Sequence, residues 1–151
     1  MQKISPFLWF DSQAEEAVNF YASVFKNSKV RRMTPGPGGK VMVAEFELEG
    51  LHFIALNGGP HFKFTEAISM SVDCKDQAEV DYYWERLTSG GGQPGQCGWL
   101  KDKFGLSWQI VPEALPRLLN DPDAAKASRV MQAMMQMTKI EVDRLEQACA
   151  G

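Results

Sequence analysis

The sequence contains few cysteines and no long apolar run, and both absences narrow the class of protein. Its three cysteines, Cys74, Cys97 and Cys149, form no close pair and no CxxC motif, which indicates reduced thiols. No apolar stretch approaches the ~20 residues that cross a membrane. The N-terminal residues Met-Gln-Lys-Ile-Ser-Pro lack the apolar segment and cleavage site of a signal peptide. We therefore expect a cytoplasmic protein with no membrane partner.

The chain also lacks an excess of positively charged residues. The chain has 16 lysines and arginines against 19 aspartates and glutamates, which gives a net charge of −3. No basic patch stands out, so nucleic acid is not expected as a partner. A chain of 151 residues with 44% hydrophobic residues can instead bury a core of its own as one domain.

One pattern occurs twice along the chain. An apolar run, Ile4–Phe10, is followed by Asp-Ser-Gln-Ala-Glu, where a helix is expected to begin. A second apolar run, Ile68–Val72, is followed by Gln77-Ala78-Glu79, where another helix is expected. Gly-punctuated strands come after each helix. The repeat predicts two similar strand–helix–strands halves with a cleft where they face each other.

The first half has clear periodic signals. Ser12-x-x-Glu15 predicts a capping box for a helix whose buried face repeats at i, i+3, i+4 and i+7. The strand that spans residues 40–49 alternates, with Met42, Ala44, Phe46 and Leu48 on one face. The other strands are expected at Ile4–Phe10, Lys29–Thr34 and Leu51–Asn57, and a Gly/Pro loop at Pro35–Gly39.

The second half repeats this order, and a helical tail follows it. Strands are expected at Ala67–Asp73, Cys97–Lys101 and Leu106–Val111, and Asp76 is expected to cap the helix between them. In the tail, Leu115–Leu119 predicts a short helix. Asp121-Pro122 and Thr138-x-x-Glu141 predict the starts of two more helices. This tail lies outside the repeat and is expected to pack on the body or on a second subunit.

Several segments together resemble the PhnB-like, 3-demethylubiquinone methyltransferase-like branch of the vicinal oxygen chelate superfamily. They are Phe20-Tyr21, Asn57-Gly58-Gly59-Pro60, Cys97-Gly98-Trp99, the stretch from Asp102 through Trp108-Gln109-Ile110-Val111-Pro112, and the Met-rich tail. The resemblance implies an α+β fold of two βαβββ-type modules, within a single domain over residues 1–112. The modules would span residues 1–60 and 61–112, with C-terminal helices over residues 113–151. It also implies a homodimer.

Metal-dependent members of that superfamily hold a divalent ion with His, Glu or Gln at four inward strand positions. The resemblance aligns those positions with Pro6, with Phe53 or Asn57, with Ala67 or Glu66, and with Gln109. The side chains of Pro6, Phe53 and Ala67 cannot bind a cation, and Gln109 offers one neutral oxygen. His52 and His61 lie off these positions, and we interpret them as ordinary surface or loop residues. No metal centre and no cofactor is predicted.

Methyl transfer and covalent catalysis have little support from the residues. A methyl donor would use a Gly-rich turn between a strand and a helix, but Pro35–Gly39 lies between strands and Gly90–Gly92 follows a helix. Cys97 is the candidate nucleophile, and its interpretation as a buried strand cysteine is favoured over a catalytic one.

The favoured hypothesis is a small-molecule pocket without metal, on the concave faces of the two sheets. Its predicted lining comprises Leu8, Phe53, Asn57, Ser69, Ser71, Trp99 and Gln109. One alternative is a metal-dependent lyase, isomerase or dioxygenase with atypical ligands, for which Glu66 and Gln109 are the candidates. Another is a non-catalytic sequestration or regulatory dimer. The residues do not establish a reaction or a ligand.

Overall fold

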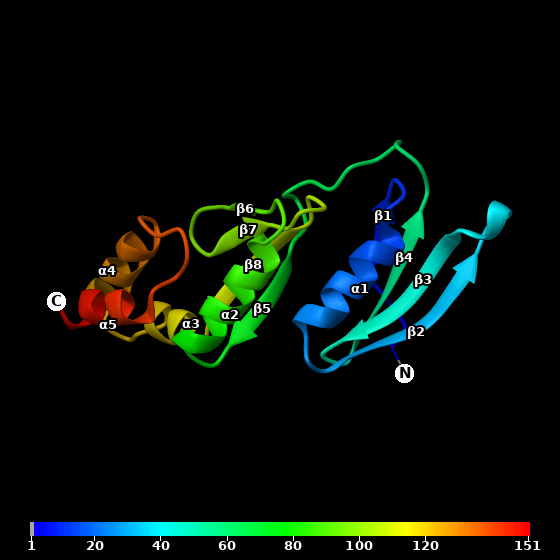
Figure 1. The fold of residues 1–151 in the computed structure, drawn as a ribbon. Helices are drawn as coiled ribbons and strands as arrows, with labels where there is room; N and C mark the ends of the chain where they lie inside the picture. The colour runs from blue at the N-terminus through cyan, green and yellow to red at the C-terminus, as the bar shows by residue number, and fades with distance from the viewer. Residues whose placement is uncertain (1) are drawn as a thin grey trace. The chain divides into compact units, whose positions relative to one another are not determined.

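The computed structural model describes residues 2–151, which divide into two compact units. The first unit ends at Phe64, and the second comprises Thr65–Gly151. Each unit has the same order of a strand, a helix and three further strands (Figure 1). This observation confirms the predicted α+β fold with two βαβββ modules and additional C-terminal helices.

The first unit is a four-stranded sheet covered on one face by a helix. In the sheet, β1 lies parallel to β4, and the strand order is β1-β4-β3-β2. The aromatic ring of Tyr21 on the helix stacks on Phe46, which in turn stacks on Phe53. The elements are β1 (Phe7–Phe10), α1 (Ala14–Val24), β2 (Ser28–Pro35), the 3-10 turn η1 (Pro37–Gly39), β3 (Val41–Leu48) and β4 (Leu51–Asn57).

The second unit repeats this topology, and its last three strands are shorter than their counterparts in the first unit. Its strand order is β5-β8-β7-β6, and β5 lies parallel to β8 just as β1 does to β4. Asp76 caps the helix as predicted, because its side chain accepts a hydrogen bond of 3.0 Å from the Glu79 amide. The elements are β5 (Met70–Cys74), α2 (Gln77–Thr88), β6 (Gln93–Pro94), β7 (Trp99–Lys101) and β8 (Ser107–Pro112).

Three C-terminal helices belong to the second unit: α3 (Ala114–Leu119), α4 (Ala124–Met134) and α5 (Val142–Ala150). They enclose a core of their own around Val130 and Leu145. Two backbone hydrogen bonds of 2.8 Å join the segment between α4 and α5 to the residues that precede β7. The amide of Cys97 donates to the Met137 carbonyl, and the amide of Gly98 donates to the Thr138 carbonyl. The C-terminal segment is therefore an integral part of the second unit.

Three predicted helix starts are wrong in their capping residues. The side chain of Ser12 does not cap α1; the Ala14 amide bonds to Asn57 Oδ1 at 2.8 Å instead. Asp123 rather than Asp121 caps α4. The first amide of α5 donates to Gln77 Oε1 at 2.7 Å, and the Thr138 box does not form.

Several strand boundaries also differ from the prediction. The strand expected from Ile4 begins at Phe7, and the strand expected from Ala67 begins at Met70. Cys97 and Gly98 precede β7 instead of belonging to it. Both have positive φ, 58° at Cys97 and 86° at Gly98, which is incompatible with extended strand geometry.

Among the described residues, no helix combines the length and the apolar character that a membrane crossing requires.

Candidate functional site

Each sheet has one face under its helix and one face turned away from it, which we call the open face. In the first unit the buried face carries Leu8, Ala44, Phe46, Phe53 and Ala55. Leu8 is 5% exposed and Phe53 is 4% exposed. Both were predicted on the concave face, and that prediction of orientation is wrong, because α1 covers the side on which they lie.

Asn57 connects elements of the first unit. Its Oδ1 accepts the hydrogen bond from the Ala14 amide at the start of α1, and its Nδ2 donates to the Val41 carbonyl at 2.9 Å. It also borders a broad groove of about 770 Å³ between the start of α1 and the turn between β2 and β3. The amide is therefore occupied in positioning α1, away from the open face.

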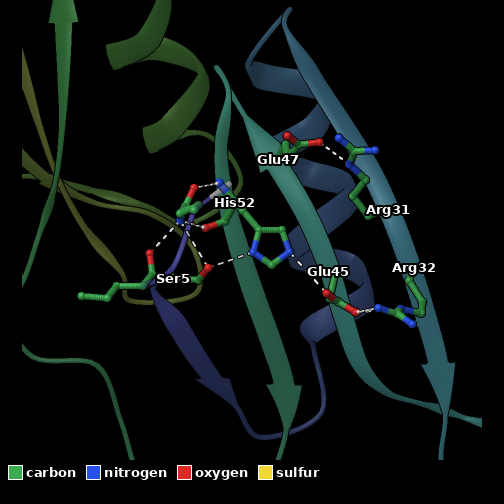
Figure 2. Close-up of polar contacts among 8 residues, drawn as sticks. Ser5, Arg31, Arg32, Glu45, Glu47 and His52 are labelled. Atoms are coloured by element: carbon green, nitrogen blue, oxygen red, sulfur yellow. Dashed lines mark hydrogen bonds and ion pairs between the residues drawn. The ribbon is translucent and has the colours of Figure 1, made fainter.

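The open face of the first sheet carries a continuous polar chain (Figure 2). Ser5 Oγ lies 2.9 Å from His52 Nδ1, and His52 Nε2 lies 3.3 Å from Glu45 Oε1. The other oxygen of Glu45 pairs with Arg32 at 2.7 Å. His52 was interpreted as an ordinary surface or loop residue. In the structure this side chain of β4 contacts Ser5 of the N-terminal segment and Glu45 of β3, and Glu45 in turn pairs with Arg32 of β2.

A bulge in β2 enlarges this polar surface. The register shifts between Val30 and Arg32, and Arg31 pairs with Glu47 while its neighbour Arg32 pairs with Glu45. A bulge allows consecutive side chains to reach the same face, which regular alternation would prevent. The hydrogen bond from Arg32 lowers the pKa of Glu45, and that from Arg31 lowers the pKa of Glu47. Both carboxylates are therefore ionised at neutral pH.

The open face of the second sheet brings four of the predicted pocket residues together. Ser71 lies opposite Gln109 in the parallel pair, and Gln109 lies opposite Trp99 in the antiparallel pair. Gln109 Nε2 donates to Ser69 Oγ at 3.0 Å. Ser69, Ser71, Trp99 and Gln109 therefore form one surface across β5, β8 and β7 and the segment that precedes β5.

A cavity of about 140 Å³ lies at the β7 side of this surface. The Ser107 side chain, 1% exposed, lines the cavity, and its hydroxyl has no hydrogen-bond partner among the described residues. Buried hydroxyls without a partner are rare in native proteins and require an explanation. The other lining residues are Glu66, Gln93, Pro94, Gly95, Trp99, Leu100 and Lys101.

The side chains present do not suit a divalent metal centre. Within residues 2–151, no three His, Cys, Asp or Glu side chains gather where one ion could be held. Glu66 is paired with Lys101 at 2.7 Å, and the amide of Gln109 is bonded to Ser69. Phe53 lies in the core. The donors that superfamily chemistry would require are thus apolar or already engaged.

The cysteines offer limited chemistry. Cys97 is half-buried in a turn, and its amide is bonded to the C-terminal segment. The candidate nucleophile therefore lies in a turn before β7 and not within a strand. Cys74 is buried, and desolvation raises the pKa of its thiol to about 12. A thiol with that pKa is almost entirely protonated at neutral pH and is a poor nucleophile.

Two βαβββ units of matching topology define the class of the vicinal oxygen chelate proteins, and comparisons with known proteins specify the family. The family model described as 3-demethylubiquinone-9 3-methyltransferase matches residues 2–111. The chain therefore belongs to that family, the PhnB-like branch of the superfamily.

One solved structure supports this assignment, and two more distant ones share the fold. The PhnB protein from Bacillus cereus is 33% identical, with a TM-score of 0.69, over 74% of this chain and 99% of that chain. Protein PA1353 from Pseudomonas aeruginosa is 21% identical, with a TM-score of 0.63, over 75% of this chain and 98% of its own. A glyoxylase/bleomycin resistance protein/dioxygenase domain from Frankia sp. EAN1pec shares the fold at 15% identity, with a TM-score of 0.52, over 74% and 92% of the two chains. None of the curated proteins compared matches this chain.

Proposed function

We propose that this PhnB-like protein binds a small molecule without a metal ion, at the open face of its second sheet. The observation that carries the proposal is the buried, unpartnered hydroxyl of Ser107 in a cavity beside Trp99. A ligand atom that bonds to this hydroxyl would account for it. Small-molecule sites typically combine apolar walls with a few polar groups that orient the ligand.

The size and charge of the cavity restrict its ligand. An engineered apolar cavity of ~150 Å³ holds one benzene, so the part of a ligand that enters 140 Å³ is about one small ring. Lys101 and Glu66 neutralise each other at the lining. An uncharged group with one hydrogen-bonding atom therefore fits best, and the rest of the ligand would lie over Ser71, Trp99 and Gln109.

Substitution of Ser107 by alanine should change stability and binding in opposite directions. Removal of an unpartnered buried hydroxyl is expected to raise the free energy of unfolding by about 1 kcal/mol. For a chain of this length, that corresponds to an increase of roughly 2–4 °C in Tm. The same substitution should weaken ligand binding about tenfold, because one buried hydrogen bond is lost.

The test is a screen of uncharged monocyclic fragments by ligand-observed NMR, followed by titration of each hit against the wild type and the Ser107→Ala variant. Ser89→Ala is the matched control, because Ser89 is exposed at the end of α2 and belongs neither to the cavity lining nor to the surface of Ser71, Trp99 and Gln109. If every hit binds Ser107→Ala as tightly as the wild type, or if no fragment binds the wild type, the proposal fails.

The family description names methyl transfer, but the chain has no glycine-rich turn in the position that would bind a methyl donor. Pro35–Gly39 lies between β2 and β3, and Gly90–Gly92 follows α2 and leads to β6. Neither connects a strand to a following helix, the context in which a Gly-rich turn holds a nucleotide-like cofactor. We therefore propose ligand binding rather than methyl transfer.

We also propose that the protein is a homodimer in the cytoplasm. The family resemblance supports the dimer, and the free thiols of Cys74, Cys97 and Cys149 suit a reducing compartment. Met131 and Met135 of the C-terminal segment are 43% and 58% exposed, which provides apolar surface for a partner. Light scattering at micromolar concentration should give twice the mass of the 16.9 kDa chain, and a monomer there would refute the dimer.

A further inference from the structure

The polar chain on the open face of the first sheet has a defined hydrogen-bond direction. An ionised carboxylate only accepts hydrogen bonds, so the His52 Nε2 that faces Glu45 must carry the proton. In the neutral imidazole, Nδ1 then has a free lone pair. Ser5 Oγ, 2.9 Å away, must therefore donate its proton to Nδ1.

The remaining contacts agree with this direction. Gln2 Nε2 donates to the carbonyls of Ile4 and His52 at 2.9 Å and also lies 3.3 Å from Ser5 Oγ. Because an amide nitrogen accepts no hydrogen bond, this contact leaves the hydroxyl proton of Ser5 for His52 Nδ1. At the far end, Arg32 bonds to Glu45 and maintains its negative charge. The side chains of His52 and Glu45 are only 27% and 24% exposed. An acid, an imidazole and a hydroxyl are thus aligned in one half-buried chain.

We propose that Ser5 is a nucleophile toward activated acyl esters, with His52 as its general base and Glu45 as the residue that positions His52. Ser5 Oγ forms a bond to the ester carbonyl carbon, and its proton moves to His52 Nδ1. The bond from that carbon to the leaving oxygen or sulfur breaks, and the leaving group takes the proton from Nδ1. Water then cleaves the acyl-serine by the same proton path, which releases a carboxylic acid and restores the hydroxyl.

The same face provides a surface for the acyl group. Side chains alternate along a strand, so Ile54 and Leu56 share the face of His52, and Phe7 and Trp9 share one face of β1. Phe7 lies opposite Ile54, and Trp9 lies opposite Leu56. Phe7 is 56% exposed. This apolar strip selects esters with a short apolar acyl chain.

The leaving group determines the rest of the substrate class. Aryl esters and thioesters release good leaving groups, so their acyl transfer depends less on donors that stabilise a carbonyl oxyanion. The proposal is therefore made for aryl esters and thioesters of short apolar acids, and it is separate from ligand binding in the second unit.

The experiment uses the full chain with p-nitrophenyl butyrate as substrate and phenylmethylsulfonyl fluoride as covalent probe. Mass spectrometry of peptides should locate the sulfonyl adduct on Ser5, and Ser5→Ala should reduce hydrolysis about 100-fold. His52→Asn, whose amide oxygen retains an acceptor near the place of Nδ1, should lose a similar factor because it is not a base. Ser28→Ala is the control, because Ser28 Oγ bonds to the Ala22 carbonyl and no histidine.

Glu45→Gln tests the positioning role with a readout other than rate. Nitrogen NMR of wild-type His52 should show a protonated Nε2 and an unprotonated Nδ1, and the variant should show a mixture of tautomers with about tenfold slower hydrolysis. Circular dichroism and thermal melting establish that each variant is folded. The proposal is overturned if no adduct forms on Ser5, if His52→Asn is labelled at the wild-type rate, or if Ser5→Ala retains wild-type hydrolysis.

Discussion

Substitution of Asp102 by alanine is expected to destabilise the protein by about 3–5 kcal/mol, the largest effect predicted for a single side chain. Asp102 is 3% exposed and lies at the turn before β8. Its Oδ1 accepts from the amides of Phe104 at 2.9 Å and Leu106 at 3.1 Å, and its Oδ2 accepts from Trp108 Nε1 at 2.9 Å. Each buried donor that loses its partner costs ~1–3 kcal/mol.

The effect should be visible in a thermal melt and in the tryptophan fluorescence. For a chain of this size the loss corresponds to a decrease of roughly 10–15 °C in Tm. Asp102→Asn should lose about half as much, because its carbonyl oxygen still accepts the two backbone amides while its NH2 group faces the Trp108 donor. Asp73→Asn, on an exposed aspartate of β5, is the control. Equal melting of Asp102→Ala and the wild type would contradict the role assigned to this carboxylate.

The repeat and most elements were predictable because their signals are local. The alternation of Met42, Ala44, Phe46 and Leu48 identifies β3, because the last three of these side chains are buried and the other side of the strand carries glutamates. Asp76 lies three residues before the amide that it caps, so its role is visible in the sequence. Each signal involves residues within a few positions of one another.

The orientation of β4 was not predictable for the same reason. Leu51, Phe53 and Ala55 alternate with His52, Ile54 and Leu56, and both sets are largely apolar. Alternation therefore does not distinguish the buried face from the open face of β4, and a one-residue error in the alignment assigns every side chain to the wrong face. That error placed Phe53 on the open face of the first sheet and His52 on the buried face. The β3 pattern resolves the choice, because Phe46 pairs with Phe53 and Glu47 with His52.

Helix starts and both candidate sites depend on residues distant in the sequence. The first amides of α1 and α5 bond to Asn57 and Gln77, which lie 43 and 65 positions away. Local capping motifs at Ser12 and Thr138 could not reveal these partners. The same limit applies to Ser5, Glu45 and His52, which meet only when three segments of the first unit pack, and to the cavity around Ser107.

Substitution of Gly98 by alanine is the second large expected effect, because this glycine is where the C-terminal segment meets the second sheet. Its φ is 86°, a left-handed conformation that costs roughly 1–2 kcal/mol for a residue with a side chain. A methyl group here would lie 3.0 Å from Ile140 Cγ1 and 3.1 Å from the Ile110 carbonyl, closer than the optimal ~3.5–4.0 Å. Ile140 is fully buried and cannot move aside freely.

Strain and crowding together should lower the free energy of unfolding by about 2–4 kcal/mol and Tm by roughly 5–15 °C. Gly105→Ala separates the two terms, because Gly105 has a φ of 89° and its added methyl would meet no atom within 4 Å. That control should lose only the ~1–2 kcal/mol of strain. Hydrogen exchange at the Gly98 amide, which bonds to Thr138, should increase more in Gly98→Ala than in the control. If Gly98→Ala and Gly105→Ala lose the same free energy of unfolding, backbone strain alone accounts for the effect. Crowding against Ile140 would then make no contribution.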